Sequence, residues 1–318
     1  MKNTSKTIVF FGNERLATGV KTSAPTLQAL IKARYNVAAV IVNNEHSKSR
    51  SKQQHLEIED IAKANNIPVL LPKKLIDIEQ QLKDYGASVG VLIAYGKIVP
   101  QSIIDIFPKG IINIHPSLLP KHRGPTPIES AILNNDSDTG VSIMQLTKDM
   151  DAGPVFAQSQ IKLDGTETKQ YLADTLLNIG GAMLLDILPE ILHGNIVALP
   201  QDISGATYDN LLSKKDGVVD WRKPAQQIER EIRAFMNWPK SHVKIGDRDV
   251  IITKARAVSD IDLLENIKCG EIITTDDYLA IKTGKGALIL VTVKPAGKKE
   301  MTSKAFLVGN KIIQQQQL

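Results

Sequence analysis

Two polar side chains end an apolar run in the segment INIHPSLLPKHRG, residues 111–123. Because side chains alternate between the faces of a strand, Asn113 and His115 are expected to point the same way, opposite to Ile112 and Ile114. An imidazole exchanges protons near neutral pH, and an amide can donate to an oxygen that gains negative charge. The pair therefore suits attack on a carbonyl-type carbon. The alternative is a histidine that merely ends a strand, with the asparagine in its turn.

Two features of the chain that follows bear on this choice. Four prolines stiffen the loop after the strand: Pro116, Pro120, Pro125 and Pro127. Further along, the segment KDMDAGPVF places Asp151 beside a Gly-Pro turn. A carboxylate near an imidazole can fix its tautomer and favour its protonated form. Spacing does not decide whether Asp151 reaches His115, and the alternative is an ordinary turn residue.

The elements that must position these residues alternate between apolar runs and helical segments. The runs TIVFFG, VAAVIVN, ASVGVLIA and GIINIH are separated by helical patterns such as APTLQALIKARY and LEIEDIAKANN. Such a series indicates an α/β domain with a parallel sheet covered on both faces. Ligands of these sheets bind at the carboxyl ends of the strands, where Asn113 and His115 stand. The single glycine of FFGNER does not complete a G-x-G-x-x-G pattern, so nicotinamide binding is not indicated.

A long helix and a connector close the first domain. Residues 168–192 have the pattern of a long helix, and residues 193–210 have glycine, proline, aspartate and serine but little periodicity. A short amphipathic helix, AQQIEREIRAFM, then precedes short strand-like runs with turn signals between them, which indicate a small β-barrel or sandwich. We expect a first domain over residues 1–195, a linker over 196–206 and a second domain over 207–318.

The positive charge of the chain is concentrated in its last third. The 318 residues have a formal net charge of +5. Residues 1–206 hold 20 basic and 20 acidic residues, whereas residues 207–318 hold 19 basic and 14 acidic residues. The surplus suggests an anionic partner for the second domain, or else an ordinary solvated surface.

Cysteine content and the N-terminal residues bear on the compartment. Cys269 is the single cysteine, which excludes an internal disulfide and fits a reducing compartment. The N-terminal apolar run is too short for a secretory signal or a membrane span. The sequence also has no metal-ligand spacing. We therefore expect a cytoplasmic protein without a metal or a membrane partner.

Two long motifs resemble the folate-dependent formyltransferase family. They are NIHPSLLPKHRGPTPIESAI and TGVSIMQLTKDMDAGPV, and the resemblance extends from Phe10 to about Val308. The segments GATYDNLLSKKDGVVDW, QQIEREIRAFMNWP and KPAGKKEM are similar to the C-terminal domain of members that act on tRNA. The resemblance implies a Rossmann-like formyltransferase domain with a mostly parallel sheet, followed by an OB-like β-barrel. It also implies transfer of the formyl group of 10-formyltetrahydrofolate to the free α-amine of methionyl-initiator tRNA, for translation initiation.

The resemblance implies roles for particular residues. The catalytic trio would be Asn113, His115 and Asp151. The folate-contacting positions would be Ser117, Leu118, Leu119 and Pro120, with Tyr95 and Ile98 at the pteridine pocket and Phe10, Phe11 and Gly12 entering the cleft. The family commonly has Thr-Pro after the first strand, where this chain has Asn13-Glu14.

Basic residues would select the tRNA. The resemblance places a tRNA-binding loop at residues 46–56, with Lys48, Arg50 and Lys52, and the alternative is a solvated charged loop. Further candidates in the second domain are Lys214, Lys215, Arg222, Lys223, Lys298 and Lys299. A monomer is expected from the resemblance alone.

Rival interpretations share the catalytic trio. A sugar-amine N-formyltransferase acting on a nucleotide-linked amino sugar should lack the basic loop and the basic second domain. A glycinamide ribonucleotide formyltransferase would leave the residues after Ala206 unexplained. A formyltetrahydrofolate hydrolase would replace the amine by water. A non-catalytic tRNA-binding protein would have no use for the trio.

Overall fold

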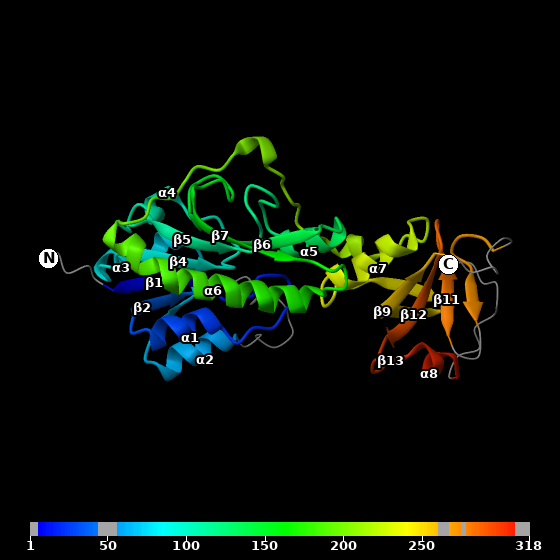
Figure 1. Cartoon of the computed structure of the whole chain (residues 1–318). Coiled ribbons are helices and arrows are strands. Elements are labelled where there is room, and N and C mark those ends of the chain that lie inside the picture. The colour runs from blue at the N-terminus through cyan, green and yellow to red at the C-terminus, as the bar shows by residue number, and fades with distance from the viewer. Residues whose placement is uncertain (1–5, 44–55, 260–266, 275–277, 309–318) are drawn as a thin grey trace. The chain divides into compact units, whose positions relative to one another are not determined.

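The computed structural model describes residues 6–43, 56–259, 267–274 and 278–308 (Figure 1). The chain divides into two compact units, each of which is built from more than one segment. The first unit comprises Met1–Ile128, Ser137–Leu163 and Gln170–Asn210. The second comprises Glu129–Asp136, Asp164–Lys169 and Leu211–Leu318.

A seven-stranded sheet with the order β3-β2-β1-β4-β5-β6-β7 forms the centre of the first unit. Five strands pair in parallel: β1 (Thr7–Gly12), β2 (Asn36–Ile41), β3 (Val69–Leu70), β4 (Val89–Ile93) and β5 (Ile111–His115). The antiparallel strands β6 (Asp138–Gln145) and β7 (Val155–Lys162) extend the sheet beyond β5. The predicted mostly parallel α/β sheet is confirmed, with β5 in its interior.

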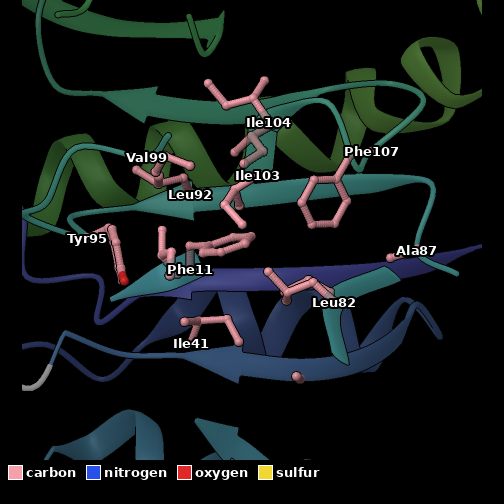
Figure 2. Packing of buried hydrophobic residues seen from close by; sticks show 14 residues of the cluster. Phe11, Ile41, Leu82, Ala87, Leu92, Tyr95, Val99, Ile103, Ile104 and Phe107 are labelled. Carbon is pink, nitrogen blue, oxygen red and sulfur yellow. The ribbon is translucent and has the colours of Figure 1, made fainter. Parts of the chain in front are cut away.

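Helices lie between these strands along the chain and after the last of them. They are α1 (Pro25–Lys32), α2 (Glu57–Ala64), α3 (Glu79–Asp84), α4 (Gln101–Ile104), α5 (Pro127–Leu133) and α6 (Lys169–His193), with short 3₁₀ turns at Leu75–Ile78 and Ile203–Gly205. One face of the sheet carries an aromatic core around Phe11 (Figure 2), whose ring meets those of Tyr95 and Phe107 edge-on at centroid distances of 6.0 and 5.9 Å. Edge-on aromatic pairs of this kind add to the stabilisation from burial. This core fixes β1 and β4 beside β5.

Helix α6 packs closely on β5 through a glycine. A Cβ added at Gly180 would lie 2.5 Å from Cγ2 of Ile114 and 3.0 Å from Cγ1 of Val141. Ile114 therefore faces α6, and the alternation of the strand directs Asn113 and His115 to the opposite face. Among the described residues, α6 alone is long and apolar enough to cross a membrane, yet Leu172, Leu176, Leu184 and Leu188 are fully buried within the protein.

An antiparallel sheet with the order β10-β11-β12-β9-β8 forms the second unit, and β13 pairs with β12. Its strands are β8 (His242–Ile245), β9 (Arg248–Val258), β10 (Ile272–Thr274), β11 (Leu279–Lys282), β12 (Ala287–Pro295) and β13 (Met301–Thr302). Helix α7 (Ala225–Ala234) buries Ile228 and Ile232 with Trp221 in the core of this sheet, and α8 (Ser303–Val308) adds Phe306. The predicted OB-like architecture is confirmed as a curled antiparallel half-barrel.

A buried ion pair joins distant segments within the second unit. The ammonium of Lys169, at the start of α6, lies 3.5 Å from Oε1 of Glu129 on α5. It also donates to the carbonyl of Trp238 at 2.8 Å. Burial lowers the pKa of Lys169, and the charge of Glu129 partly opposes that shift. Short segments around Glu129 and Lys169, far from the C-terminal sheet in the sequence, thus belong to the second unit.

Candidate active site

The site begins at the carboxyl end of β5. Asn113 pairs with Leu92 of β4 and Met144 of β6, and His115 pairs with Ser142 of β6. Both side chains are buried, with 6% and 4% of their residues' surface exposed. Within the described residues the Asn113 amide makes no side-chain hydrogen bond, so its N–H groups are available to a substrate.

The two ring nitrogens of His115 have different partners. Nε2 lies 2.9 Å from the carbonyl oxygen of His122. A carbonyl only accepts, so Nε2 must carry a proton and donate it. Nδ1 lies 3.7 Å from Oδ2 of Asp151, within the range of an ion pair but longer than a hydrogen bond. Nδ1 is therefore the nitrogen that can take up or release a proton beside a carboxylate.

Asp151 is held in place by its neighbours in two loops. Its Oδ2 accepts from the backbone N–H of Gly124 at 2.8 Å. The amide of Gln201 donates to the carbonyls of Asp151 and Gly153 at 2.8 and 2.7 Å. A Cβ at Gly153 would overlap the carbonyl of Gln145, so the turn beside Asp151 requires glycine. The structure thus places Asp151 beside His115, a contact that their spacing in the sequence could not decide.

The loop after His115 is fixed to the antiparallel strands. Ser142 Oγ donates to the carbonyl of Ser117 at 2.7 Å and accepts from the backbone N–H of Leu119 at 3.0 Å. Gln158 Nε2 donates to the carbonyl of Leu119 at 2.8 Å. Ser117 and Leu119 are buried, whereas Leu118 and Pro120 are half-buried. The four positions expected to contact folate therefore form a rigid edge beside His115.

The remaining expected folate positions differ in exposure. Tyr95 is buried in the aromatic core, where desolvation raises its pKa to about 12. Ile98 is 78% exposed. Phe10 and Phe11 are fully buried, and a Cβ at Gly12 would overlap the carbonyl of Ile93, so only glycine fits where β1 ends against β4.

The expected tRNA-binding residues are only partly described. Lys48, Arg50 and Lys52 lie outside the described residues. Of the lysines expected to bind tRNA in the second unit, Lys214, Lys215, Lys298 and Lys299 are exposed. Arg222 pairs with Asp220 at 2.8 Å, and Lys223 pairs with Glu231 at 2.6 Å, so both have acidic partners within the protein.

Sequence reasoning missed several residues around the site. The ring of His122 lies 3.2 Å from the carboxylate of Asp209. Arg123 is buried and donates to Oε1 of Gln201 and to the hydroxyl of Tyr208. His122 and Arg123 stand inside the motif PKHRG, which could have drawn attention to them, but the connector residues carried no such signal. No group of metal-ligating side chains occurs among the described residues.

Two family models match the chain. The model described as "Formyl transferase" matches residues 7–188, and "Formyl transferase, C-terminal domain" matches residues 211–311. The first covers more than half of the chain. It includes Asn113 and His115 on β5, and also Asp151. The fold and the match together define the class of protein as a formyl transferase.

Curated relatives specify the family further. A methionyl-tRNA formyltransferase from Roseiflexus castenholzii is 38% identical over 297 residues, which cover 92% of this chain and 93% of the relative. Another from Lachnospira eligens is 34% identical over 311 residues, covering 96% of this chain and 97% of the relative. The chain belongs to the methionyl-tRNA formyltransferase family.

Solved structures with a similar fold include an N-formyltransferase and HypX. An N-formyltransferase from Helicobacter canadensis, in complex with folinic acid and dTDP-3-aminofucose, has a TM-score of 0.67 at 19% identity, covering 90% of this chain and 98% of that chain. HypX from Aquifex aeolicus, in complex with tetrahydrofolic acid, has a TM-score of 0.59 at 15% identity, covering 94% and 46%. At these identities the likeness concerns the fold alone.

Proposed function

We propose that the chain transfers the formyl group of 10-formyltetrahydrofolate to the free α-amine of methionyl-initiator tRNA. The product is N-formylmethionyl-tRNA for translation initiation. The observation that carries this proposal is the His115 ring, which lies between the His122 carbonyl and the Asp151 carboxylate at the end of β5. The names of the curated relatives, over nearly the whole chain, support the choice of acceptor.

The first step is attack of the neutral amine on the formyl carbon attached to N10 of the folate. A new C–N bond forms, and the formyl oxygen becomes an oxyanion. The Asn113 amide, which faces the same side of the strand as His115, donates to that oxygen. One such donor in a buried site typically lowers the barrier by ~3–4 kcal/mol.

The second step moves a proton from one nitrogen to the other. Nδ1 of His115 accepts the proton that the attacking nitrogen loses and returns it to N10 as the C–N10 bond breaks. Asp151 Oδ2, 3.7 Å away, stabilises the imidazolium that exists between these two events. The ring ends in its starting state, so proton and charge balance over one turnover.

The folate lies along the loop after β5 in this proposal. Ser117, Leu118, Leu119 and Pro120 contact it, and their fixed backbone supports a preorganised site. Ile98 offers an exposed apolar side chain to the pteridine, and Tyr95 supports the pocket wall from within the core.

The tRNA binds through basic side chains. Lys48, Arg50 and Lys52 neutralise phosphates of the acceptor stem, and exposed lysines of the second unit, such as Lys214 and Lys298, bind further phosphates of the RNA. We expect the enzyme to act as a monomer in the cytoplasm, where charged initiator tRNA is present.

One competition assay tests the acceptor. The full-length protein is given 10-formyltetrahydrofolate together with methionyl-initiator tRNA and a nucleotide-linked amino sugar in equal amounts. We expect formylated methionyl-tRNA and no formylated sugar. Product from the sugar alone would replace the proposed acceptor by the sugar amine, and formate without either product would indicate hydrolysis.

A further inference from the structure

A second histidine–carboxylate pair lies directly behind the first. His122 accepts the hydrogen bond of His115 Nε2 through its backbone carbonyl, at 2.9 Å. Its own ring Nδ1 lies 3.2 Å from Oδ1 of Asp209, and the two side chains are 8% and 9% exposed. The mechanism above uses neither the ring of His122 nor Asp209.

The backbone of His122 needs support from its neighbours. Its φ is 57°, in the left-handed region, where the Cβ of an L-residue crowds the backbone. Thr207 Oγ1 accepts from the N–H of His122 at 2.7 Å, and the Thr207 carbonyl accepts from the N–H of Arg123 at 2.9 Å. The N–H of Asp209 donates to the carbonyl of Arg123 at 2.8 Å. Thr207 and Asp209, in the connector between the two domains that the family models match, thus hold residues 122 and 123 in position.

The Asp209 carboxylate binds the His122 ring in one orientation. Oδ1 can only accept, so Nδ1 of His122 carries the proton and donates. Oδ2 is buried and has no hydrogen-bond partner among the described residues. Separation from His122 would leave this carboxylate buried without its ring partner, which is costly in a protein interior.

From this geometry we infer that Asp209 is a positioning residue for the formyl transfer. It fixes the His122 ring, and with it the carbonyl that holds the proton on Nε2 of His115. Nδ1 of His115 is then always the free nitrogen facing Asp151. The inference rests on the proposed function, because it gives His115 the proton transfer. When Asp209 is lost, the carbonyl moves and either nitrogen of His115 can carry the proton.

Two substitutions at one position separate positioning from general stability. Asp209→Ala removes the acceptor of the His122 ring, and we expect kcat to fall about 10–100-fold, the loss typical of hydrogen-bond partners that orient metal-ligating histidines. The KM values for folate and tRNA should stay within about twofold, because the substrate contacts remain. Asp209→Asn keeps an oxygen that accepts from Nδ1 and should retain most of kcat. The matched control is Asp202→Ala, an exposed carboxylate of the same connector that caps Ser204, and it should leave kcat unchanged.

The ring nitrogens of His115 provide a readout that does not depend on turnover. We expect ¹⁵N NMR of the wild-type protein to show a protonated Nε2 and an unprotonated Nδ1 for His115, assigned by the signals lost in His115→Ala. Asp209→Ala should show a mixture of both tautomers, and Asp209→Asn the wild-type pattern. If Asp209→Ala fails to fold, Thr207→Val removes the acceptor of the His122 N–H and should give the same mixture.

The outcomes distinguish this inference from the proposed function. Wild-type kcat in Asp209→Ala, or equal losses in the Ala and Asn variants with an unchanged His115 tautomer, would reduce Asp209 to a structural residue and overturn the inference. A wild-type protein that does not formylate methionyl-tRNA would contradict the acceptor. The NMR comparison would still decide whether Asp209 sets the tautomer.

Discussion

At the scale of single residues, the proposed mechanism gives the two nitrogens of His115 separate tasks. Nε2 anchors the ring to the His122 carbonyl, and Nδ1 faces the Asp151 carboxylate. Asn113 adds a donor on the same side of the strand. An imidazole whose rotation is fixed in this way can exchange a proton without first reorganising, which is the structural meaning of a preorganised acid–base group.

His115→Ala should abolish most of the turnover without loss of folate affinity. Removal of a general acid–base group typically costs about 10²–10⁴-fold in rate, whereas the proposed folate contacts lie in the following loop. Single-turnover formylation and equilibrium folate binding measure the two effects. His193→Ala, an exposed histidine that binds the carbonyl of Pro189, serves as the control and should behave as wild type. A wild-type rate in His115→Ala would remove the ring from the mechanism.

Glu14 is a buried carboxyl that supports α1. Its two oxygens accept from the backbone N–H groups of Thr26 and Leu27 at 2.9 and 2.7 Å, in the first turn of a helix whose N-cap residue, Ala24, offers no side-chain acceptor. Desolvation nevertheless dominates and raises the pKa of Glu14 to about 7 from 4.5. Glu14 thus caps α1 from the loop after β1.

The raised pKa of Glu14 predicts a pH-dependent stability. The folded state binds the proton of Glu14 more tightly than the unfolded state does. The contribution of this proton to the free energy of unfolding is therefore fully present below pH 4.5 and is lost as the pH rises through about 7. The loss amounts to about 3 kcal/mol over that window. Glu14→Gln cannot ionise, so urea titrations at pH 4.5 and 7.5 should show a smaller fall in the free energy of unfolding than in wild type. Equal falls in both proteins would contradict the assignment.

At the scale of elements, the contact between α6 and β5 fixes the strand that carries the site. Gly180 allows the helix to approach Ile114, and this contact directs Ile114 away from the face that carries Asn113 and His115. Because Asn113 and His115 are on the same short strand, a shift of β5 would move both at once. The packing of one helix thus determines the position of the two side chains to which we assign the chemistry.

Gly180→Ala should destabilise the protein although alanine is the better helix former. The propensity gain of about 1 kcal/mol is opposed by overpacking against Ile114 and Val141, which typically costs 1–3 kcal/mol. Thermal unfolding and kcat should therefore both decrease. Asn178→Ala, at an exposed position of the same helix, should be neutral or slightly stabilising. A higher melting temperature in Gly180→Ala would show that α6 can yield at this contact.

At the scale of the whole molecule, the basic loop predicts salt-dependent recognition of RNA. Arg50 lies outside the described residues, so this prediction rests on the sequence. If Arg50 neutralises one phosphate, Arg50→Ala should raise the KM for tRNA and reduce the slope of log KM against log salt by about 0.7–0.9. The KM for folate should not change. Lys63→Ala, an exposed charge on α2, is the control, and a slope equal to wild type in Arg50→Ala would favour a solvated loop.

Much of the fold was predictable because its strands are apolar runs. Four of the five parallel strands and the shared face of Asn113 and His115 follow from the sequence pattern, whereas the two-residue strand β3 was not predicted. Strands β6 and β7 were not predicted, since their polar residues interrupt the apolar pattern. The approach of Asp151 to His115 depends on contacts from Gly124 and Gln201, distant in sequence, and local spacing does not contain such information.

The pair of His122 and Asp209 is a second contact that the sequence pattern did not predict. Composition assigned residues 193–210 to a connector, and the secondary structure agrees, with only one short 3₁₀ turn in the described segment after α6. Yet Thr207 and Asp209 hold the backbone behind His115. A segment without regular structure gives no periodic signal, even where each of its hydrogen bonds has a definite partner.

The buried ammonium of Lys169 limits where the protein can be truncated without loss of structure. Its partners are Glu129, from the first half of the chain, and the carbonyl of Trp238, from the second. A fragment that stops at Asn210 would keep the lysine and the glutamate but lose the carbonyl and the cover around them. The first two hundred residues therefore do not form an independent folding unit. A fusion or truncation that exchanges the C-terminal domain must also supply a hydrogen-bond acceptor for the Lys169 ammonium and side chains that cover it.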